Sequence, residues 1–272
     1  MKIKLSIPAA FALFFIVAVV VGGLLASRLA PYVPTQIDPL NRLKPPTFEH
    51  LFGTDNLGRD IFSRVLYGTQ VSLLVAVAVP IVTGLLGLFF GLVAGFVRPL
   101  DGVIMRIMDG IMAIPEMLLA IALAAIFSAR IEMVVIAIAV PEIPRTTRLV
   151  RGLVLSIREM LYVEAAVSMG ASFTRILFRH VAPNTVAPLM VQMIYVGALA
   201  VLVEAYLSFL GVGVPPDMPS WGNVVAQGRD YISVSPWGIV FPGLLIALLV
   251  LSANIVLDDL RDNLEHAALK RT

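Results

Sequence analysis

The sequence has no cysteine, few histidines and few charged residues. Without cysteine, none of the 272 residues can form a disulfide, a thiolate zinc site or an iron–sulfur cluster. His50, His180 and His266 are scattered along the chain, so we expect no histidine-rich metal site and no bound metal. The net charge of +2 is too small to suggest nucleic-acid binding. These absences exclude several large classes of redox, metal-dependent and nucleic-acid-binding proteins.

Apolar residues dominate what remains. Hydrophobic residues make up 59% of the chain and charged residues 14%, against roughly 25% charged in an average soluble domain. The mean hydropathy is +0.93. We therefore interpret the chain as a membrane protein. At about 20 residues per transmembrane helix, six helices use roughly 120 residues, which leaves no room for a second large soluble domain.

Six apolar runs predict six membrane spans, at residues 7–26, 71–97, 111–128, 133–150, 185–210 and 237–257. The first run follows Lys2 and Lys4, as a signal peptide would, but it is longer than a usual signal core and lacks a clear cleavage site. We interpret it as a retained helix. The fourth run contains Pro141, Glu142 and Pro144 and is therefore predicted to be kinked or short.

The positions of lysine and arginine predict the orientation. An even number of spans places both termini on one side of the membrane. With that side cytoplasmic, thirteen of the 20 Lys and Arg residues are inside and seven outside, the seven being Arg28, Arg42, Lys44, Arg59, Arg64, Arg130 and Arg229. This bias agrees with the excess of positive charge in cytoplasmic loops.

The topology divides the chain into segments. Residues 1–30 form the first helix, residues 31–69 an outer linker and surface helix, residues 70–260 a core of five helices, and residues 261–272 a cytoplasmic tail. The outer segment begins with several prolines, and Asp55 is then predicted to cap a short helix on the membrane surface, with Leu57, Ile61, Val65 and Leu66 on its apolar face.

A long cytoplasmic loop, residues 151–183, has strong helical character. Residues 163–169 favour a helix that Gly170 can end, and residues 173–178 favour a second amphipathic turn before Pro183 opens the next span. An ordinary solvated loop is the alternative interpretation. Loops of this length usually have a function, so we expect this one to bind a partner.

The same loop carries a recognisable motif. Glu164, Ala165 and Ala166, then Gly170 and later Pro183, resemble the EAA motif in permeases of binding-protein-dependent ABC importers. The resemblance implies that the loop docks into a groove on a cytoplasmic ATPase. In that interpretation Glu164 braces the helix, the alanines let it seat closely, and the coupling residues are Glu164, Ala165, Ala166, Gly170, Ala171 and Pro183.

Further segments narrow the resemblance. Residues 52–60, 207–213 and 241–243, with Asn254 and residues 260–262, are similar to the dipeptide, oligopeptide and nickel permeases, especially their C-type subunit. The chain departs from the family pattern at Glu116 and at residues 141–144, which weakens any inference about cargo.

The resemblance implies an all-α transmembrane fold of six helices, with a type I ABC importer permease-like core and a cytoplasmic coupling helix. It also implies the partners: a homologous B-type permease, two cytoplasmic ATPases that bind ATP and Mg²⁺, and an extracytoplasmic solute-binding protein. The chain itself would bind lipid but no cofactor, in a bacterial inner membrane.

Three carboxylates fall inside predicted spans. Each of Glu116, Glu142 and Glu204 would cost about 2.5–3.5 kcal/mol at the bilayer centre, so each should face a cavity or a cation. Glu116 is the strongest candidate for the substrate pathway, although pairing with Arg106 is an alternative. Glu142 can pair with Arg145, and Glu204 can have a structural role.

Glycines in the second span predict close helix packing. Gly87, Gly91 and Gly95 lie four residues apart, which forms two overlapping small-xxx-small motifs on one helix face. The sequence does not indicate which helix packs there.

Two other functional classes stay open. A channel or secondary carrier would transport without ATPases, and an intramembrane enzyme would need paired catalytic groups, yet no predicted span contains an aspartate. Because the chain also lacks a P-loop, a zinc-protease helix and a serine-hydrolase elbow, we expect a transport subunit without catalytic residues. The cargo, whether peptide, nickel, metal chelate or glutathione, cannot be read from the spans.

Overall fold

The computed structural model describes residues 6–126 and 130–269, with side chains up to residue 263. Within this part every regular element is helical, and the extended pairing consists of one bridge between Thr54 and Asp60. The elements are α1 (Ile7–Leu24), α2 (Ala26–Leu29), η1 (Pro39–Asn41), α3 (Ile61–Phe96), α4 (Arg98–Met112), α5 (Glu116–Ile126), α6 (Ile131–Arg158), α7 (Leu161–Ser168), α8 (Phe173–Ile176), η2 (Leu177–Val181), α9 (Ala182–Phe209), α10 (Trp221–Gly228), η3 (Arg229–Tyr231) and α11 (Trp237–Leu269).

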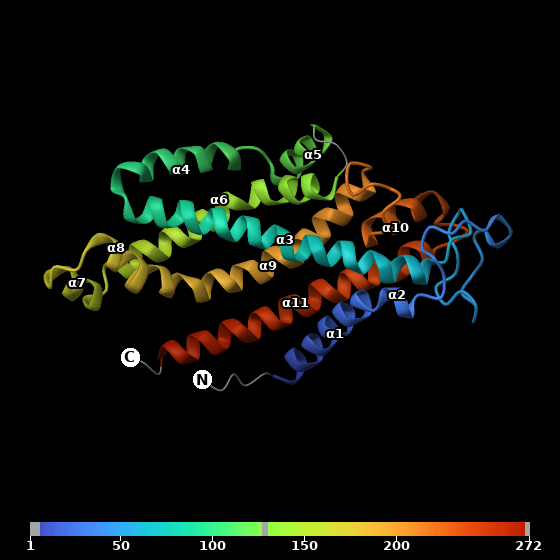
Figure 1. Ribbon diagram of the computed structural model, residues 1–272, viewed down its shortest axis with the longest axis horizontal. Helices are drawn as coiled ribbons and strands as arrows, with labels where there is room; N and C mark the ends of the chain where they lie inside the picture. Colours follow the sequence, from blue (N-terminus) through green and yellow to red (C-terminus); the bar gives the residue numbers. More distant parts are fainter. Residues whose placement is uncertain (1–5, 127–129, 270–272) are drawn as a thin grey trace.

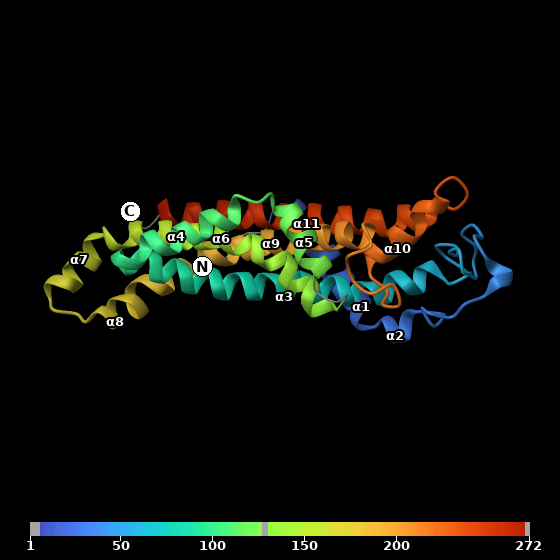
Figure 2. The ribbon, with the colours of Figure 1, turned by 90° about the horizontal axis from the view of Figure 1, so that it is seen from above.

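The long helices form an elongated bundle with two distinct ends. Figure 1 shows α7 and α8 at one end, and α10 with the loop of residues 31–60 at the other. Figure 2 shows the same separation after a quarter turn. We refer to these as the α7 end and the α10 end. The backbone N–H of Ser6, just before α1, donates to Asp259 of α11 at 3.1 Å, which ties the start of the first helix to the last one.

Among residues 6–126 and 130–269, four helical stretches are long and apolar enough to cross a membrane: residues 7–24, 61–96, 173–209 and 237–263. A fifth crossing is possible if α4 and α5, bent by 84° where they meet, form one broken span. The helix α6 occupies the predicted fourth span but carries several charged residues. The transmembrane, all-helical class is therefore confirmed, whereas the count of six spans stays a prediction.

The predicted surface helix before the second span is wrong. The residues assigned to it from Ile61 onward are the first turns of α3, which continues without a break to Phe96. Asp60 caps α3 by accepting from Ser63 N at 2.7 Å. Asp55 instead accepts from the backbone of Leu57 and Arg59. The chain turns at Gly58, where φ is +77°, so Asp55 lies too early to cap the helix.

The third and fourth predicted spans also differ from the structure. Residues 113–115 interrupt the third, so Glu116 lies in the first turn of α5 instead of inside a continuous helix. The fourth is not shortened, because α6 runs through both Pro141 and Pro144 for 28 residues. Proline is tolerated in such helices where neighbouring helices satisfy the freed backbone groups.

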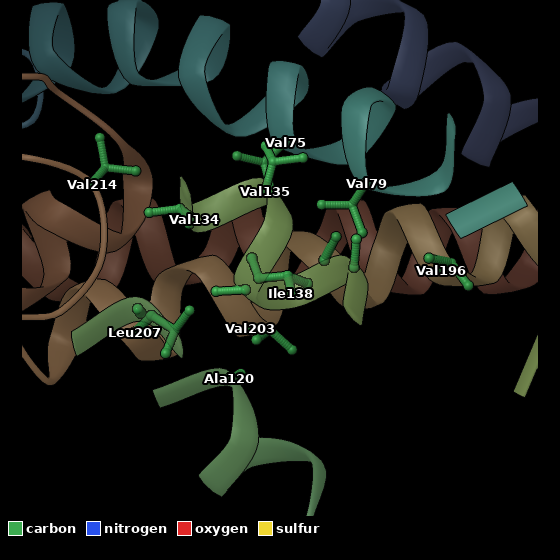
Figure 3. Packing of buried hydrophobic residues seen from close by; sticks show 14 residues of the cluster. Val75, Val79, Ala120, Val134, Val135, Ile138, Val196, Val203, Leu207 and Val214 are labelled. Carbon is green, nitrogen blue, oxygen red and sulfur yellow. The ribbon is translucent and has the colours of Figure 1, made fainter. Parts of the chain in front are cut away.

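The core lies between α3, α6 and α9. Figure 3 shows Val75 and Val79 of α3 meeting α6, with Val196, Val203 and Leu207 of α9 in the same cluster. The predicted glycine face packs on α6: a Cβ added at Gly87, Gly91 or Gly95 would come within 2.5–2.7 Å of side-chain atoms of Thr146, Val150 and Val154 respectively. The glycine pattern is thus confirmed as a packing face, and its partner is α6.

Candidate functional site

The loop of residues 151–183 folds into α7, α8 and the π-helical turn η2. Gly170, with φ of +81°, ends α7, and its backbone N–H donates to Val167 O at 2.9 Å. The next N–H, of Ala171, donates to Ala166 O at 3.0 Å. A glycine is favoured here because side chains are strained at positive φ. Glu164 lies in the first turn of α7, where the helix dipole stabilises a negative charge.

The two sides of α7 have different roles. Val163 and Ala166 are buried, and Val163 packs on the cluster that contains Val150 and Val154 of α6. Glu164 and Ala165 are exposed. Of the expected coupling residues, Ala166 therefore faces this chain, whereas Glu164 and Ala165 remain available to a partner.

Apolar side chains are exposed around α7. Leu161 is 82% exposed and Met169 81%, and Val167, Phe173 and Phe178 are also exposed. Exposed apolar patches on otherwise packed proteins mark interaction sites. The α7 end therefore presents an uncovered surface that extends beyond the long helices.

Contacts at the base of α7 hold it firmly to the bundle. The ring of Phe173 meets Phe96, at the end of α3, with centroids 4.3 Å apart. Asn184, in the first turn of α9, donates to the Tyr162 hydroxyl at 3.3 Å. Pro183, the last expected coupling residue, is exposed beside it and opens α9. Tyr162 thus attaches α7 to α9, Phe173 attaches α8 to α3, and Val163 packs α7 on α6.

Three arginines along α6 pair with carboxylates of α4 and α5. Arg151 binds Asp101 through two hydrogen bonds of 2.5 and 2.7 Å, and Arg148 binds Asp109 at 2.5 Å. Nearer the middle of α6, Arg145 lies 3.6 Å from Glu116. We call these three pairs the arginine ladder. The ladder joins α4 and α5 to the helix that leads into α7.

Two of the three predicted intramembrane carboxylates meet at the top of the ladder. Arg145 donates to Glu142 at 3.0 Å while also facing Glu116. The Glu142–Arg145 pair named from the sequence is therefore present, and the cation beside Glu116 is Arg145 and not Arg106, the alternative.

The third carboxylate, Glu204, is fully buried and fastens two helices together. Its Oε1 accepts hydrogen bonds of 2.8 Å from both Ser208 on α9 and Ser220, which caps α10. Since Glu204 has no exposed surface, it holds α9 and the start of α10 together and does not face a pathway through this chain.

A polar cluster at the α10 end was missed by reasoning from the sequence. Arg64 of α3 is almost fully buried and donates to Asp55 at 2.6 Å and to Gln227 of α10 at 2.9 Å. Arg59 donates to the same two side chains. The resemblance drew attention to residues 52–60, but no local pattern indicated that Gln227 would meet them.

Comparison with known proteins adds the family. The model of the family described as "Binding-protein-dependent transport system inner membrane component" matches residues 84–270. A protein of Sinorhizobium fredii named as a probable peptide ABC transporter permease is 47% identical over 247 residues, covering 91% of this chain and 85% of that protein.

Two further relatives are named for different cargoes. A dipeptide transport system permease of Alkalihalophilus pseudofirmus is 40% identical over 267 residues, covering 97% of this chain and 87% of its own length. A glutathione transport system permease of Pectobacterium atrosepticum is 39% identical over 253 residues, covering 92% and 84%.

Proposed function

Since this chain belongs to the family of binding-protein-dependent transport system inner membrane components, we propose that it is one permease subunit of an ATP-driven peptide importer. The relatives named above are described as permeases for peptides, dipeptides and glutathione, itself a short peptide. Their names favour peptides over nickel or metal chelates. In addition, the described residues contain no group of three or more His, Cys, Asp or Glu side chains suited to a metal ion.

We propose that a homologous second permease packs against the side of α4–α6 that carries the arginine ladder. The side chains of Arg145, Arg148 and Asp109 are 44–52% exposed when this chain stands alone. Charged groups within a membrane face protein or a water-filled cavity because lipid cannot solvate them. A second subunit would cover the pairs at Arg151 and Arg148 and would enclose a polar pathway beside the third pair, Arg145 with Glu116.

We propose that the exposed surface around α7 is the contact with a cytoplasmic ATPase, which would place the α7 end in the cytoplasm. Its apolar side chains, Leu161 and Met169 above all, would be buried against such a partner. A pair of ATPases would hold ATP and Mg²⁺, and a solute-binding protein would deliver cargo at the α10 end.

The attachment of α7 suggests how movement would pass into the membrane. Residues 159–160 alone separate α7 from α6, and α8 with η2 joins it to α9. Closure of the ATPases would push on α7, and the rigid connections would reorient α6 and α9 together. The observation that carries this proposal is the combination of an uncovered apolar surface with firm attachment to three long helices.

Two substitutions in the assembled transporter test the coupling. Gly170→Val strains the turn that orients α7, because φ there is +81°, and Glu164→Lys reverses an exposed charge. Matched controls are Gly152→Val, where an added Cβ meets nothing within 4 Å, and Glu132→Lys, at the far end of α6. We expect the two α7 variants to reach the membrane and lose most uptake per ATP hydrolysed, whereas the controls keep it.

Normal uptake and normal ATPase stimulation in both α7 variants would refute the contact. The competing class, a channel or carrier, predicts something different: this chain alone in vesicles would transport peptide without any ATPase. We expect no transport from the isolated chain.

A further inference from the structure

Glu116 and Glu142 form an incompletely neutralised pair around Arg145. The guanidinium lies 3.0 Å from Glu142 Oε1 and 3.6 Å from Glu116 Oε2. Both carboxylates therefore share one guanidinium. With both carboxylates ionised beside one guanidinium, the cluster has an excess negative charge that a second cation would stabilise.

One oxygen of this cluster has no hydrogen-bond partner within the described part of the chain. Glu142 is 2% exposed, and its Oε2 is buried without a donor. A buried carboxylate oxygen without a donor is unfavourable, and such an exception calls for an explanation. A donor from outside this chain would provide one.

The cluster lies near mid-depth of the bundle and is open on one side. Thr146, which follows Arg145, packs on Gly87 of α3. Gly87 lies three residues from the middle of the apolar run 71–97, which is about 5 Å along the helix axis at 1.5 Å per residue. At that depth the Glu116 side chain is 35% exposed and that of Arg145 46%. Exposed charges there need water or protein, and the polar pathway proposed above would supply the water.

The helix break beside Glu116 fits a binding role. Residues 113–115 separate α4 from α5 at an 84° bend. Irregular backbone at membrane depth occurs where it lines a cavity or is buried in protein, and broken helices form binding sites in many transporters. Glu116 is the first residue after this break.

We infer that Glu116 and Glu142 bind the amino terminus of the peptide as it passes through the transporter, an inference that rests on the proposed function. A primary ammonium has one positive charge and three N–H donors, so it can bind the exposed Glu116 carboxylate directly. Oε2 of Glu142 is buried, so the ammonium donates to it only after the Glu116 side chain moves aside. The adjacent guanidinium disfavours a divalent metal ion, which would also need more oxygen ligands. Arg145 stays on Glu142 Oε1, and the ammonium takes the loosely held Glu116.

Site-directed labelling in this cysteine-free chain tests the inference. Ile114→Cys places one exposed thiol of this chain in the break beside Glu116. The assembled complex, without solute-binding protein, is treated with a methanethiosulfonate reagent, and labelling of this chain is followed by mass spectrometry. The two probes are tri-alanine and N-acetyl-tri-alanine, which differ in the ammonium group.

We expect tri-alanine to slow the labelling and the acetylated peptide to have little effect. Adding Glu142→Gln should raise the tri-alanine concentration that gives half-maximal protection by about tenfold, since one charge-assisted hydrogen bond is lost. The matched variant Glu132→Gln, on the same helix but away from the cluster, should leave it unchanged.

Equal protection by both peptides, or protection by neither, would overturn the inference, and both results are obtained with the cluster intact. If Glu142→Gln left the protective concentration of tri-alanine unchanged, the inference would be overturned as well. The labelling needs no ATP, so a failure of the proposed import function would appear separately, as absent ATP-driven uptake despite protection.

Discussion

The close contact between Gly91 of α3 and Val150 of α6 predicts the effect of one added methyl group. An alanine at position 91 would place its Cβ 2.5 Å from Cβ of Val150 and 2.9 Å from the carbonyl oxygen of Thr147. Because carbon atoms prefer about 3.5–4.0 Å, the overlap is roughly 1 Å. Overpacking costs about 1–3 kcal/mol, and a backbone carbonyl that cannot rotate away favours the upper end.

The helix preference for alanine returns about 1 kcal/mol, so we expect Gly91→Ala to destabilise the protein by about 2 kcal/mol. Gly102→Ala is the matched control, since an added Cβ there meets nothing within 4 Å and receives only the helix preference. The assay is the midpoint of heat-induced unfolding of the purified protein in detergent. Because membrane proteins often unfold irreversibly, variants are compared as a rank order at one heating rate.

A second substitution on α6 should reveal the contact directly. Val150→Ala keeps the Cβ that lies 2.5 Å away, so it should not rescue Gly91→Ala, whereas Val150→Gly removes that atom and should. The double variant Gly91→Ala with Val150→Gly should be less destabilised than the sum of its singles. If Gly91→Ala were as stable as Gly102→Ala, or if the double variant were additive, the packing argument would be refuted.

Two further predictions concern the arginine ladder and the orientation. Replacing Arg148 or Asp109 singly by alanine should lower the heat stability of the assembled complex more than that of the isolated subunit, because an unpaired charge costs about 3–5 kcal/mol when a second permease covers it and less than about 1 kcal/mol when it faces water. Replacing both should harm the complex less than either single change, and equal effects on subunit and complex would argue against a covered ladder. Single cysteines at Asn41 and Ser172 should label from opposite sides of the membrane in intact cells and inverted vesicles, and labelling of both by an impermeant reagent in intact cells would contradict the orientation.

Hydropathy predicted the long helices but not where they begin and end. The apolar run of the second span begins well after α3 does, because its first turns contain Arg64 and Thr69 and bury them against other parts of the protein. Hydropathy measures how readily residues enter lipid, whereas a helix continues until a residue or a turn interrupts its backbone hydrogen bonds. The break before α5 was missed because residues 113–115 are as apolar as their neighbours, although Pro115 was a local signal that a helix could end there.

Residue types at the candidate site could be predicted, but their partners could not. Carboxylates in apolar runs are conspicuous whatever the fold, so Glu116 and Glu142 were singled out as candidates from the sequence. The choice between Arg106 and Arg145 as the cation beside Glu116 depends on the 84° bend and on how α5 lies against α6. Contacts of this kind depend on packing between distant segments, which no local spacing encodes.

The two sides of α6 explain how a push on α7 could reach the cargo site. One side presents Thr146, Val150 and Val154 to the glycines of α3, where the backbones approach too closely for the helices to shift without separating. The other side carries the arginine ladder. Its pairs are short at Arg151 and Arg148, both 2.5 Å, and longer at Arg145, which lies 3.6 Å from Glu116. The helix is thus held firmly near α7 and most loosely beside the break, so a movement of α6 would be expected first to change the distance between Arg145 and Glu116, where the peptide ammonium is proposed to bind.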